Sequence, residues 1–461
     1  MKKLLSLLLV SLLISVAFVG CKEDEVSSVV NASSQNVTTS TNSESETVTS
    51  APLATSSNKP SSSSKPKKPA SKVETTTETS SEEEKVYSAK EKIYYGMDPD
   101  LYQLSLKNKG NSARIAALMK KAQKGGSYKI AVLGGSISQG AGTSNPDLCY
   151  GNLVCEWWSD NFPKASFEFV NAGIGATNPE MANYRIEADL LSFKPDFVVV
   201  DFTVNTYLDN NLYNTYSTLL YKILSQKNSP AVMSIDFTSC NREKHDYASI
   251  YEKTTDVPNS KITKAVEAYD VPAVSYHNYV WEKINKRKIS WRDIGFDYIH
   301  PNDNGHRLAA SIIACYLKNI MENLSKQPTK ITSPAKPESN DYFNLGYITN
   351  TAKGVKLSGG FSARNNMAAS TRGWSYTLTS ANSSLTIPIP ANKAVKIFMV
   401  FDDGAEGQIN ITDSANKSKT ISSSNAKTPT LVDVGMMESN ITLTPSMKKG
   451  GFTIYGIGIK K

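Results

Sequence analysis

Three residues that lie far apart in the 461-residue chain are of the types that together perform acyl transfer. Ser136 follows an apolar run and two glycines, and Asp297 lies three residues before His300. A serine hydroxyl is a weak nucleophile until a neighbouring base takes its proton. A carboxylate can then hold the imidazole of that base in the productive tautomer. We therefore predict Ser136 as the nucleophile, His300 as the base and Asp297 as its partner.

The same chemistry needs hydrogen-bond donors for the oxyanion of the tetrahedral intermediate. The backbone N–H groups of Ser136 and Gly175 and the side-chain amide of Asn205 are the candidates. Each has an ordinary structural explanation on its own, since Gly175 could form a turn and Asn205 could cap a helix. Their occurrence in order with the triad residues favours the catalytic interpretation.

A parallel sheet is the element that would position these residues. Short buried strands are expected at 130–133, 167–170, 197–204, 231–237 and 271–276, and helices at 111–120, 148–160, 180–191, 213–225, 262–269 and 304–324. This alternation predicts a sheet that is covered by helices on both faces. Because the carboxyl ends of parallel strands meet at one edge, Ser136, Gly175 and Asn205 would converge there.

The glycine-rich turn at Ser136 has a rival interpretation as a phosphate-binding loop. No Gly-Lys-Ser or Gly-Lys-Thr follows it, and no G-x-G-x-x-G motif is present. We therefore keep the nucleophile interpretation. We also expect a helix to start just after Ser136 and to direct its free N–H groups at the serine.

The order of these motifs resembles the four sequence blocks of the SGNH hydrolases, also called GDSL esterases. The blocks are Gly-Gly-Ser136, the stretch 171–177 with Gly175, Val204-Asn205, and Asp297-x-x-His300. The resemblance covers roughly residues 94–325 and implies a flavodoxin-like three-layer α/β/α fold. It also implies Ser136, His300 and Asp297 as the triad, with Gly175 and Asn205 in the oxyanion hole.

Two positions depart from the pattern of this family. Gly135 stands where the family has the aspartate of Gly-Asp-Ser, and Thr206 replaces an aspartate that often follows the asparagine. Neither position has a role in the triad. The Gly-Gly-Ser-Ile-Ser sequence, with Asn-Ala-Gly-Ile-Gly at 171–175, looks like a branch that includes carbohydrate esterases.

The N-terminus has the pattern of an export signal. Two lysines precede the apolar run 4–19, which Gly20 and Cys21 end. The run is short, so it predicts a cleaved signal rather than a spanning helix. Residues 1–21 resemble a bacterial lipoprotein signal peptide, which implies that Cys21 is lipidated. An uncleaved anchor is the alternative, and either one predicts an extracytoplasmic protein attached to the cell membrane.

Composition divides the rest of the chain into further segments. Residues 22–90 are nearly all Ser, Thr, Glu, Lys, Pro and Asn, which predicts a disordered linker. Residues 91–327 form the predicted hydrolase domain, 328–340 a second linker, and 341–461 an all-β sandwich of short strands. This sandwich could bind carbohydrate or serve as an accessory domain. Its Trp374, Tyr376 and Phe361 could bind sugar, although packing in the core is the favoured interpretation.

Other residues with chemical potential are assigned to structure. Arg185 and Asp189, one helical turn apart, are expected to form an ion pair. His306 is expected near the start of the last helix, and surface or packing roles are expected for His245 and His277. Buried thiols are favoured over disulfides for the cysteines of the body, which are Cys149, Cys155, Cys240 and Cys315.

These observations together predict a membrane-tethered serine esterase that removes O-acetyl groups from a polysaccharide. No metal-ligand spacing of Cys or His appears, so we expect no metal, no cofactor and no nucleic-acid partner. The partners would be an acetylated polysaccharide or another ester, and the membrane through the lipid anchor. The segment 206–214, rich in Asn, Asp and Tyr, suits sugar hydroxyls. Two alternatives stay open: a lipid esterase or lysophospholipase of the same family, and a glycan-binding surface protein without activity.

Overall fold

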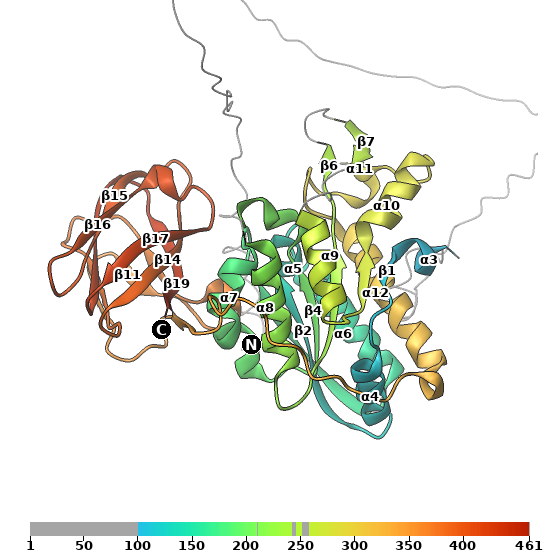
Figure 1. Cartoon of the computed structure of the whole chain (residues 1–461). Helices are drawn as coiled ribbons and strands as arrows, with labels where there is room; N and C mark the ends of the chain where they lie inside the picture. The colour runs from blue at the N-terminus through green and yellow to red at the C-terminus, as the bar shows by residue number, and fades with distance from the viewer. Residues whose placement is uncertain (1–99, 210, 242–245, 251–257, 461) are drawn as a thin grey trace, which may run out of the picture. The chain divides into compact units, whose positions relative to one another are not determined.

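The computed structural model describes residues 100–209, 211–241, 246–250 and 258–460 (Figure 1). These residues all belong to one compact unit, Tyr87–Lys461. The predicted signal peptide with Cys21, the linker 22–90 and His245 lie outside the described residues. Within the described ranges, no helix is both long and apolar enough to cross a membrane.

The first part of the described chain folds around a six-stranded sheet with the strand order β1-β8-β5-β4-β2-β3. Its strands are β1 (Leu106–Asn108), β2 (Gly126–Gly134), β3 (Ala165–Gly173), β4 (Phe197–Asp201), β5 (Ala231–Asp236) and β8 (Ala273–Ser275). Strands β2, β3, β4, β5 and β8 pair in parallel, as predicted. Strand β1 is an antiparallel edge strand that the sequence analysis did not anticipate, because its three half-buried residues show no apolar pattern.

Side chains along β2 alternate between two apolar cores, one on each face of the sheet. Ile130 and Val132 face a core that α4, α6, α10 and α12 complete, whereas Ala131 and Leu133 face a core shared with α7, α8 and α9. All four side chains are fully buried. A strand covered on both faces needs apolar residues at every position, which is what this run supplies. The result is the predicted three-layer α/β/α arrangement (Figure 1).

The helices of this region follow the predicted order, with additions. They are α3 (Leu101–Ser105), α4 (Ala113–Ala122), α5 (Ser136–Gln139), α6 (Tyr150–Asn161), α7 (Pro179–Asp189), α8 (Leu212–Leu224), α9 (Pro258–Ala268), α10 (Tyr276–Asn285), α11 (Trp291–Ile294) and α12 (Asp303–Glu322). A short hairpin of β6 (Cys240–Asn241) and β7 (Asp246–Ile250) lies between β5 and α9.

Local hydrogen bonds move two of the predicted strand ends. The strand expected at 197–204 ends at Asp201, and a 3-10 turn, Thr203–Leu208, carries Asn205. The strand expected at 271–276 is shortened to β8, because the Ser275 side chain accepts a hydrogen bond from the N–H of Asn278 and starts α10. Helix α10 was not predicted, although Ser275 is a residue type that commonly caps helix N-termini.

Beyond α12 the chain forms two antiparallel sheets around one core, the predicted sandwich. The first sheet has the order β10-β13-β18-β15-β16, and the second has β11-β12-β19-β14-β17 with β9 beside β19. The strands are β9 (Leu345–Ile348), β10 (Lys356–Ser358), β11 (Phe361–Ala363), β12 (Trp374–Tyr376), β13 (Ser384–Ile387), β14 (Lys393–Phe401), β15 (Glu406–Thr412), β16 (Ser418–Ser422), β17 (Thr430–Met437), β18 (Ile441–Lys449) and β19 (Phe452–Lys460). Trp374, Tyr376 and Phe361 are buried in the core, which confirms the packing interpretation.

Candidate active site

Ser136 lies at the carboxyl end of β2, in the interior of the sheet. The next two strands of the chain, β3 and β4, lie on opposite sides of β2. Connections that diverge in this way leave a crevice at the strand ends, where open α/β sheets bind their ligands. A helix does start at the serine, but α5 (Ser136–Gln139) is only one turn long, and its C-cap Gly140 has a φ of +106°. So short a helix supplies little dipole.

The structure brings His300 and Asp297 to Ser136 across 164 residues of sequence. Nε2 of His300 lies 2.9 Å from Oγ of Ser136, and Nδ1 lies 2.7 Å from Oδ2 of Asp297. When Nδ1 carries the proton and donates to the carboxylate, the lone pair of Nε2 is left to accept the serine proton. The three predicted triad residues therefore form one hydrogen-bonded line.

A tight turn between α11 and α12 holds the histidine and the aspartate. Oδ1 of Asp297 accepts the backbone N–H groups of Ile299 and His300, at 2.7 Å each. The indole N–H of the buried Trp291 donates to the carbonyl of Asp297 at 2.6 Å. Burial acts to raise the pKa of Asp297, but the hydrogen bonds and charge of His300 outweigh it and hold the pKa below its ordinary value. Asp297 is thus a carboxylate that both builds the turn and orients the imidazole.

Gly175 lies at the same strand edge. A Cβ atom added to it would be 3.7 Å from the Cβ of Ser136. Its N–H already has an acceptor, because it donates to Oε1 of Gln139 at 2.6 Å. Gln139 is exposed, so its side chain can rotate away when a substrate oxygen requires this donor. Gln139 was not among the predicted site residues, and its only signal in the sequence is its position three residues after the serine.

Asn205 lies against the turn that carries the nucleophile. Its Oδ1 is buried, and no described residue donates a hydrogen bond to it. A Cβ atom at Gly135 would lie 2.5 Å from this oxygen, which is closer than a side chain can approach. Glycine at position 135 therefore makes the space that Asn205 occupies beside Ser136. The structure thus brings together all five residues that the sequence analysis selected for the triad and the oxyanion hole.

Apolar side chains next to the triad were not anticipated. Phe296, directly before Asp297, is 60 % exposed, and Ile299 is 38 % exposed. In the polar segment 206–214, the described hydrogen bonds of Asp209 lie within the fold. Asp209 is buried and accepts hydrogen bonds from Thr215 Oγ1 at 2.6 Å and from the backbone N–H of Asn211 at 3.0 Å. Asn210 and the side chains at 207–208 lie outside the described residues.

The other histidines have structural surroundings. His306 is fully buried, its Nε2 lies 3.1 Å from the carbonyl of Ala141, and its Nδ1 accepts the N–H of Tyr150. Burial lowers the pKa of His306 to about 4, so it is neutral at ordinary pH. His277 is buried and stacks on Trp281. Among the described residues, no group of three or more His, Cys, Asp or Glu side chains is placed to hold a metal ion.

Comparison with known protein families agrees with this arrangement. Residues 132–308, which include every predicted site residue of the sheet region, match the model of the GDSL-like lipase/acylhydrolase family. The chain carries a GDSL-like hydrolase domain. No curated protein gives a significant sequence match.

Solved structures resemble more of the chain than the GDSL-like domain alone. A two-domain esterase active on acetylated mannans is 25 % identical, with a TM-score of 0.61, over 77 % of this chain and 97 % of that one. A structure of such an esterase co-crystallised with mannopentaose gives the same values. An acetylxylan esterase from Geobacillus stearothermophilus is 17 % identical over 41 % of this chain and 94 % of that one, with a TM-score of 0.32. The similarity to the two-domain esterase extends into the β-sandwich of this chain.

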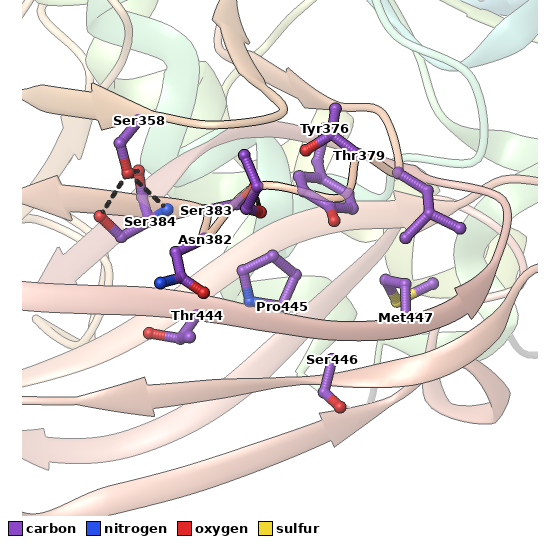
Figure 2. A pocket seen from close by; sticks show the side chains of 12 residues that line it. Ser358, Tyr376, Thr379, Asn382, Ser383, Ser384, Thr444, Pro445, Ser446 and Met447 are labelled. Atoms are coloured by element: carbon purple, nitrogen blue, oxygen red, sulfur yellow. Dashed lines mark hydrogen bonds between the residues drawn. The ribbon is translucent and has the colours of Figure 1, made fainter.

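A hollow of about 370 Å³ lies in the sandwich and includes none of the residues of the GDSL-like site (Figure 2). Its wall consists mainly of hydroxyl and amide side chains, and the hydroxyls of Ser358 and Ser384, which are partners on neighbouring strands, lie 2.9 Å apart. The lining residues are Ser358, Tyr376, Leu378, Thr379, Ala381, Asn382, Ser383, Ser384, Thr444, Pro445, Ser446 and Met447. The hollow is therefore separate from the candidate active site.

A buried carboxyl group, that of Asp201, lies on the strand next to β2, opposite Gly134. Asp201, at the end of β4, is within hydrogen-bond distance of Ser138 Oγ at 3.3 Å and of Thr203 Oγ1 at 3.4 Å. Ser138 also lies 2.7 Å from the hydroxyl of Tyr150. Burial raises the pKa of Asp201 to about 7, and no cation among these neighbours offsets it.

This environment predicts a pH-dependent stability that Asp201→Asn removes. A carboxyl group whose folded pKa exceeds its unfolded value, here 3.8, stabilises the fold at low pH. That contribution is lost as the pH rises through about 7. One pKa unit corresponds to about 1.4 kcal/mol, so the loss is at most about 4 kcal/mol. We expect Asp201→Asn to lose less free energy of unfolding than the unsubstituted protein between pH 5 and pH 8.

Urea unfolding at several pH values measures this difference. Asp147→Asn is the matched control, because Asp147 is exposed. The control should follow the unsubstituted protein at every pH. If the free energy of unfolding changed with pH in the same way for Asp201→Asn and the unsubstituted protein, Asp201 would not titrate in this range.

Proposed function

We propose that this chain is an extracytoplasmic serine esterase that removes O-acetyl groups from a polysaccharide. The observation that carries the proposal is the hydrogen-bonded line from Ser136 through His300 to Asp297, with contacts of 2.9 Å and 2.7 Å. This arrangement activates a hydroxyl nucleophile for attack on an ester carbonyl. An inactive glycan-binding protein would have no need to keep it.

The proposed reaction has two steps, and each residue of the site would have a role in it. Oγ of Ser136 attacks the acetyl carbon while Nε2 of His300 takes the serine proton, and Asp297 stabilises the imidazolium. The N–H groups of Ser136 and Gly175 and the amide of Asn205 receive the oxyanion. As the bond between the acyl carbon and the sugar oxygen breaks, His300 gives its proton to that oxygen, and the sugar leaves with a free hydroxyl. Water, activated by the same base, releases acetate from Ser136.

Two observations support an acetylated polysaccharide as the substrate. The solved two-domain esterase that resembles this chain at 25 % identity acts on acetylated mannans. In addition, the exposed ring of Phe296 lies next to the triad aspartate, where an aromatic face can pack against the apolar face of a sugar. A sugar ring that packs on Phe296 would then present its acetyl ester to Ser136.

A lipid esterase is the second candidate function. Phe296 and Ile299 lie within four residues of His300 and expose apolar side chains, and a long acyl chain needs apolar surface. The length of the acyl group that the enzyme accepts therefore distinguishes the two candidates.

We expect acetyl esters to be cleaved at least about tenfold faster than octanoyl esters, since single methylene groups already change kcat/KM by such factors in a fitted pocket. The comparison uses kcat/KM for nitrophenyl acetate and nitrophenyl octanoate, together with acetate release from acetylated mannan. Ser136→Ala supplies the background rate. Faster cleavage of the octanoate, with no acetate released from mannan, would favour the lipid esterase.

The extracytoplasmic location belongs to the same proposal and rests on the N-terminal sequence. Residues 1–21 combine a basic start, an apolar run and Cys21. Export would place the enzyme where polysaccharides are found, and a lipid on Cys21 would keep it at the cell surface. The mass of the mature N-terminal peptide tests this assignment.

A further inference from the structure

A buried arginine, Arg185 of α7, joins the ends of the strands that carry the nucleophile and the oxyanion hole. Its Nη1 donates to the carbonyl of Ala172 at 2.7 Å, and its Nη2 donates to the carbonyl of Gly134 at 3.0 Å. Gly134 lies two residues before Ser136, and Ala172 lies three residues before Gly175. The Arg185 side chain is fully buried. Its guanidinium therefore fixes the spacing between the two turns at which the reaction would take place.

The carboxylate of Asp189 binds both Arg185 and a residue of the sandwich, Arg372. Asp189 Oδ2 accepts from Nη1 of Arg185 at 3.3 Å, which confirms the predicted ion pair. Asp189 Oδ1 accepts from Nη1 of Arg372 at 2.6 Å. Arg372 follows the 3-10 turn Ala369–Thr371 of the sandwich, and it also donates to the carbonyl of Ala188. Burial acts to raise the pKa of Asp189, so the carboxylate relies on both arginines to remain charged.

Apolar packing reaches the same turn from the sandwich. Ile174, the residue before Gly175, is buried in a cluster with Met181 of α7 and with Ala369 and Phe398 of the sandwich. Ala369 lies three residues before Arg372. Both the ion pair and this cluster thus connect the sandwich to the segment 172–175.

We propose that Arg372 is a positioning residue of the active site, which acts through Asp189 and Arg185 on the backbone of Gly134 and Ala172. The inference rests on the proposed function, since it concerns the turnover of Ser136. In this arrangement the sandwich helps to position the strand ends that carry Ser136 and Gly175. Without Arg372, Asp189 is free to rotate onto Arg185 and draw its guanidinium from the Ala172 carbonyl. A donor displaced by about 1 Å costs on the order of 100-fold in rate.

The test compares Arg372→Met with Lys396→Met in the full chain. Cζ of Arg372 lies 5.5 Å from the centroid of the Phe193 ring. Methionine keeps an apolar side chain over this ring but cannot bind Asp189. Lys396 makes another ion pair between the sandwich and α7, with Glu180 at 2.7 Å, and both partners are 26 % exposed. We expect kcat on nitrophenyl acetate to fall about 10- to 100-fold in Arg372→Met, with little change in KM. Lys396→Met should stay within twofold of the unsubstituted enzyme.

The rate is expressed per Ser136 that a fluorophosphonate probe labels, which removes any loss of folded protein. A purely structural role for Arg372 would lower the labelled fraction and the melting temperature but leave this rate unchanged. If Arg372→Met does not fold, Arg372→Lys decides, because lysine keeps one charge but lacks the guanidinium fork. It should lose at least about threefold in kcat, and an unchanged kcat in a folded variant would overturn the proposal.

The same experiment separates the failure of this inference from the failure of the proposed function. An unsubstituted protein that turns over no ester would refute the proposed function. The labelling rate of Ser136 by the fluorophosphonate would then still decide the inference, because its phosphoryl oxygen uses the same donors. Equal labelling rates in Arg372→Met and the unsubstituted protein would overturn it.

Discussion

Ser136→Ala is expected to lower kcat on nitrophenyl acetate by about 10⁴- to 10⁶-fold while the protein stays folded. The serine oxygen is the atom that would bond to the acyl carbon, and no other described hydroxyl lies against His300 Nε2. Removing it leaves only substrate binding and the oxyanion donors, which retain a small part of the rate. Ser136 is partly exposed, so its loss opens no cavity in the core.

The measurement needs kcat, the melting temperature and fluorophosphonate labelling for the same preparation. Ser138→Ala is the matched control, because Ser138 lies two residues away but is fully buried against Tyr150 and Asp201. That variant should still be labelled at Ser136. Labelling that disappears in Ser138→Ala and persists in Ser136→Ala would mean that the nucleophile is misassigned.

Asp297→Asn is expected to lower kcat by about 10³- to 10⁴-fold. The carboxylate accepts from Nδ1 of His300 at 2.7 Å and so leaves Nε2 free to take the serine proton. An amide in its place can present its NH₂ group to Nδ1, which favours the opposite tautomer. The amide oxygen can still accept the N–H groups of Ile299 and His300, so the turn is expected to persist.

The effect on kcat should greatly exceed the effect on KM, because the carboxylate acts on the base and not on the bound substrate. Asp293→Asn is a useful comparison, since Asp293 caps the nearby α11 and does not contact His300. It should keep a kcat close to that of the unsubstituted enzyme. If Asp297→Asn retained most of its activity, another group would have to orient the imidazole.

The sequence by itself predicted the sheet and the residues of the candidate triad, which the structure brings within hydrogen-bond distance of one another. The apolar run 130–133 is short, rich in β-branched residues and followed by two glycines, which favours a strand covered on both faces, and the structure buries it in this way. The motifs around Ser136, Gly175, Asn205 and the Asp297–His300 pair each follow a strand or precede a helix, so their convergence follows from the topology of a parallel sheet. Spacing was sufficient for these predictions because each element is defined by a local pattern.

The structure corrected predictions where a single hydrogen bond decided the outcome. The Ser275 side chain starts α10 and shortens β8, and the residues after Asp201 form a 3-10 turn that places Asn205 beside Gly135. A buried strand and the first turn of a capped helix can have the same apolar composition. The apolar pattern at 271–276 therefore could not show where β8 ends and α10 begins.

Only the tertiary structure determined what surrounds the triad. Gln139 accepts from the Gly175 N–H across 36 residues, and Arg372 reaches Asp189 across 183. The sequence indicated the Arg185–Asp189 pair, because a spacing of four residues faces two side chains on one helix. Nothing in the sequence indicated that a second arginine from the sandwich would share that carboxylate. Contacts of this kind arise from the packing of distant surfaces, and packing depends on the whole chain rather than on a local period.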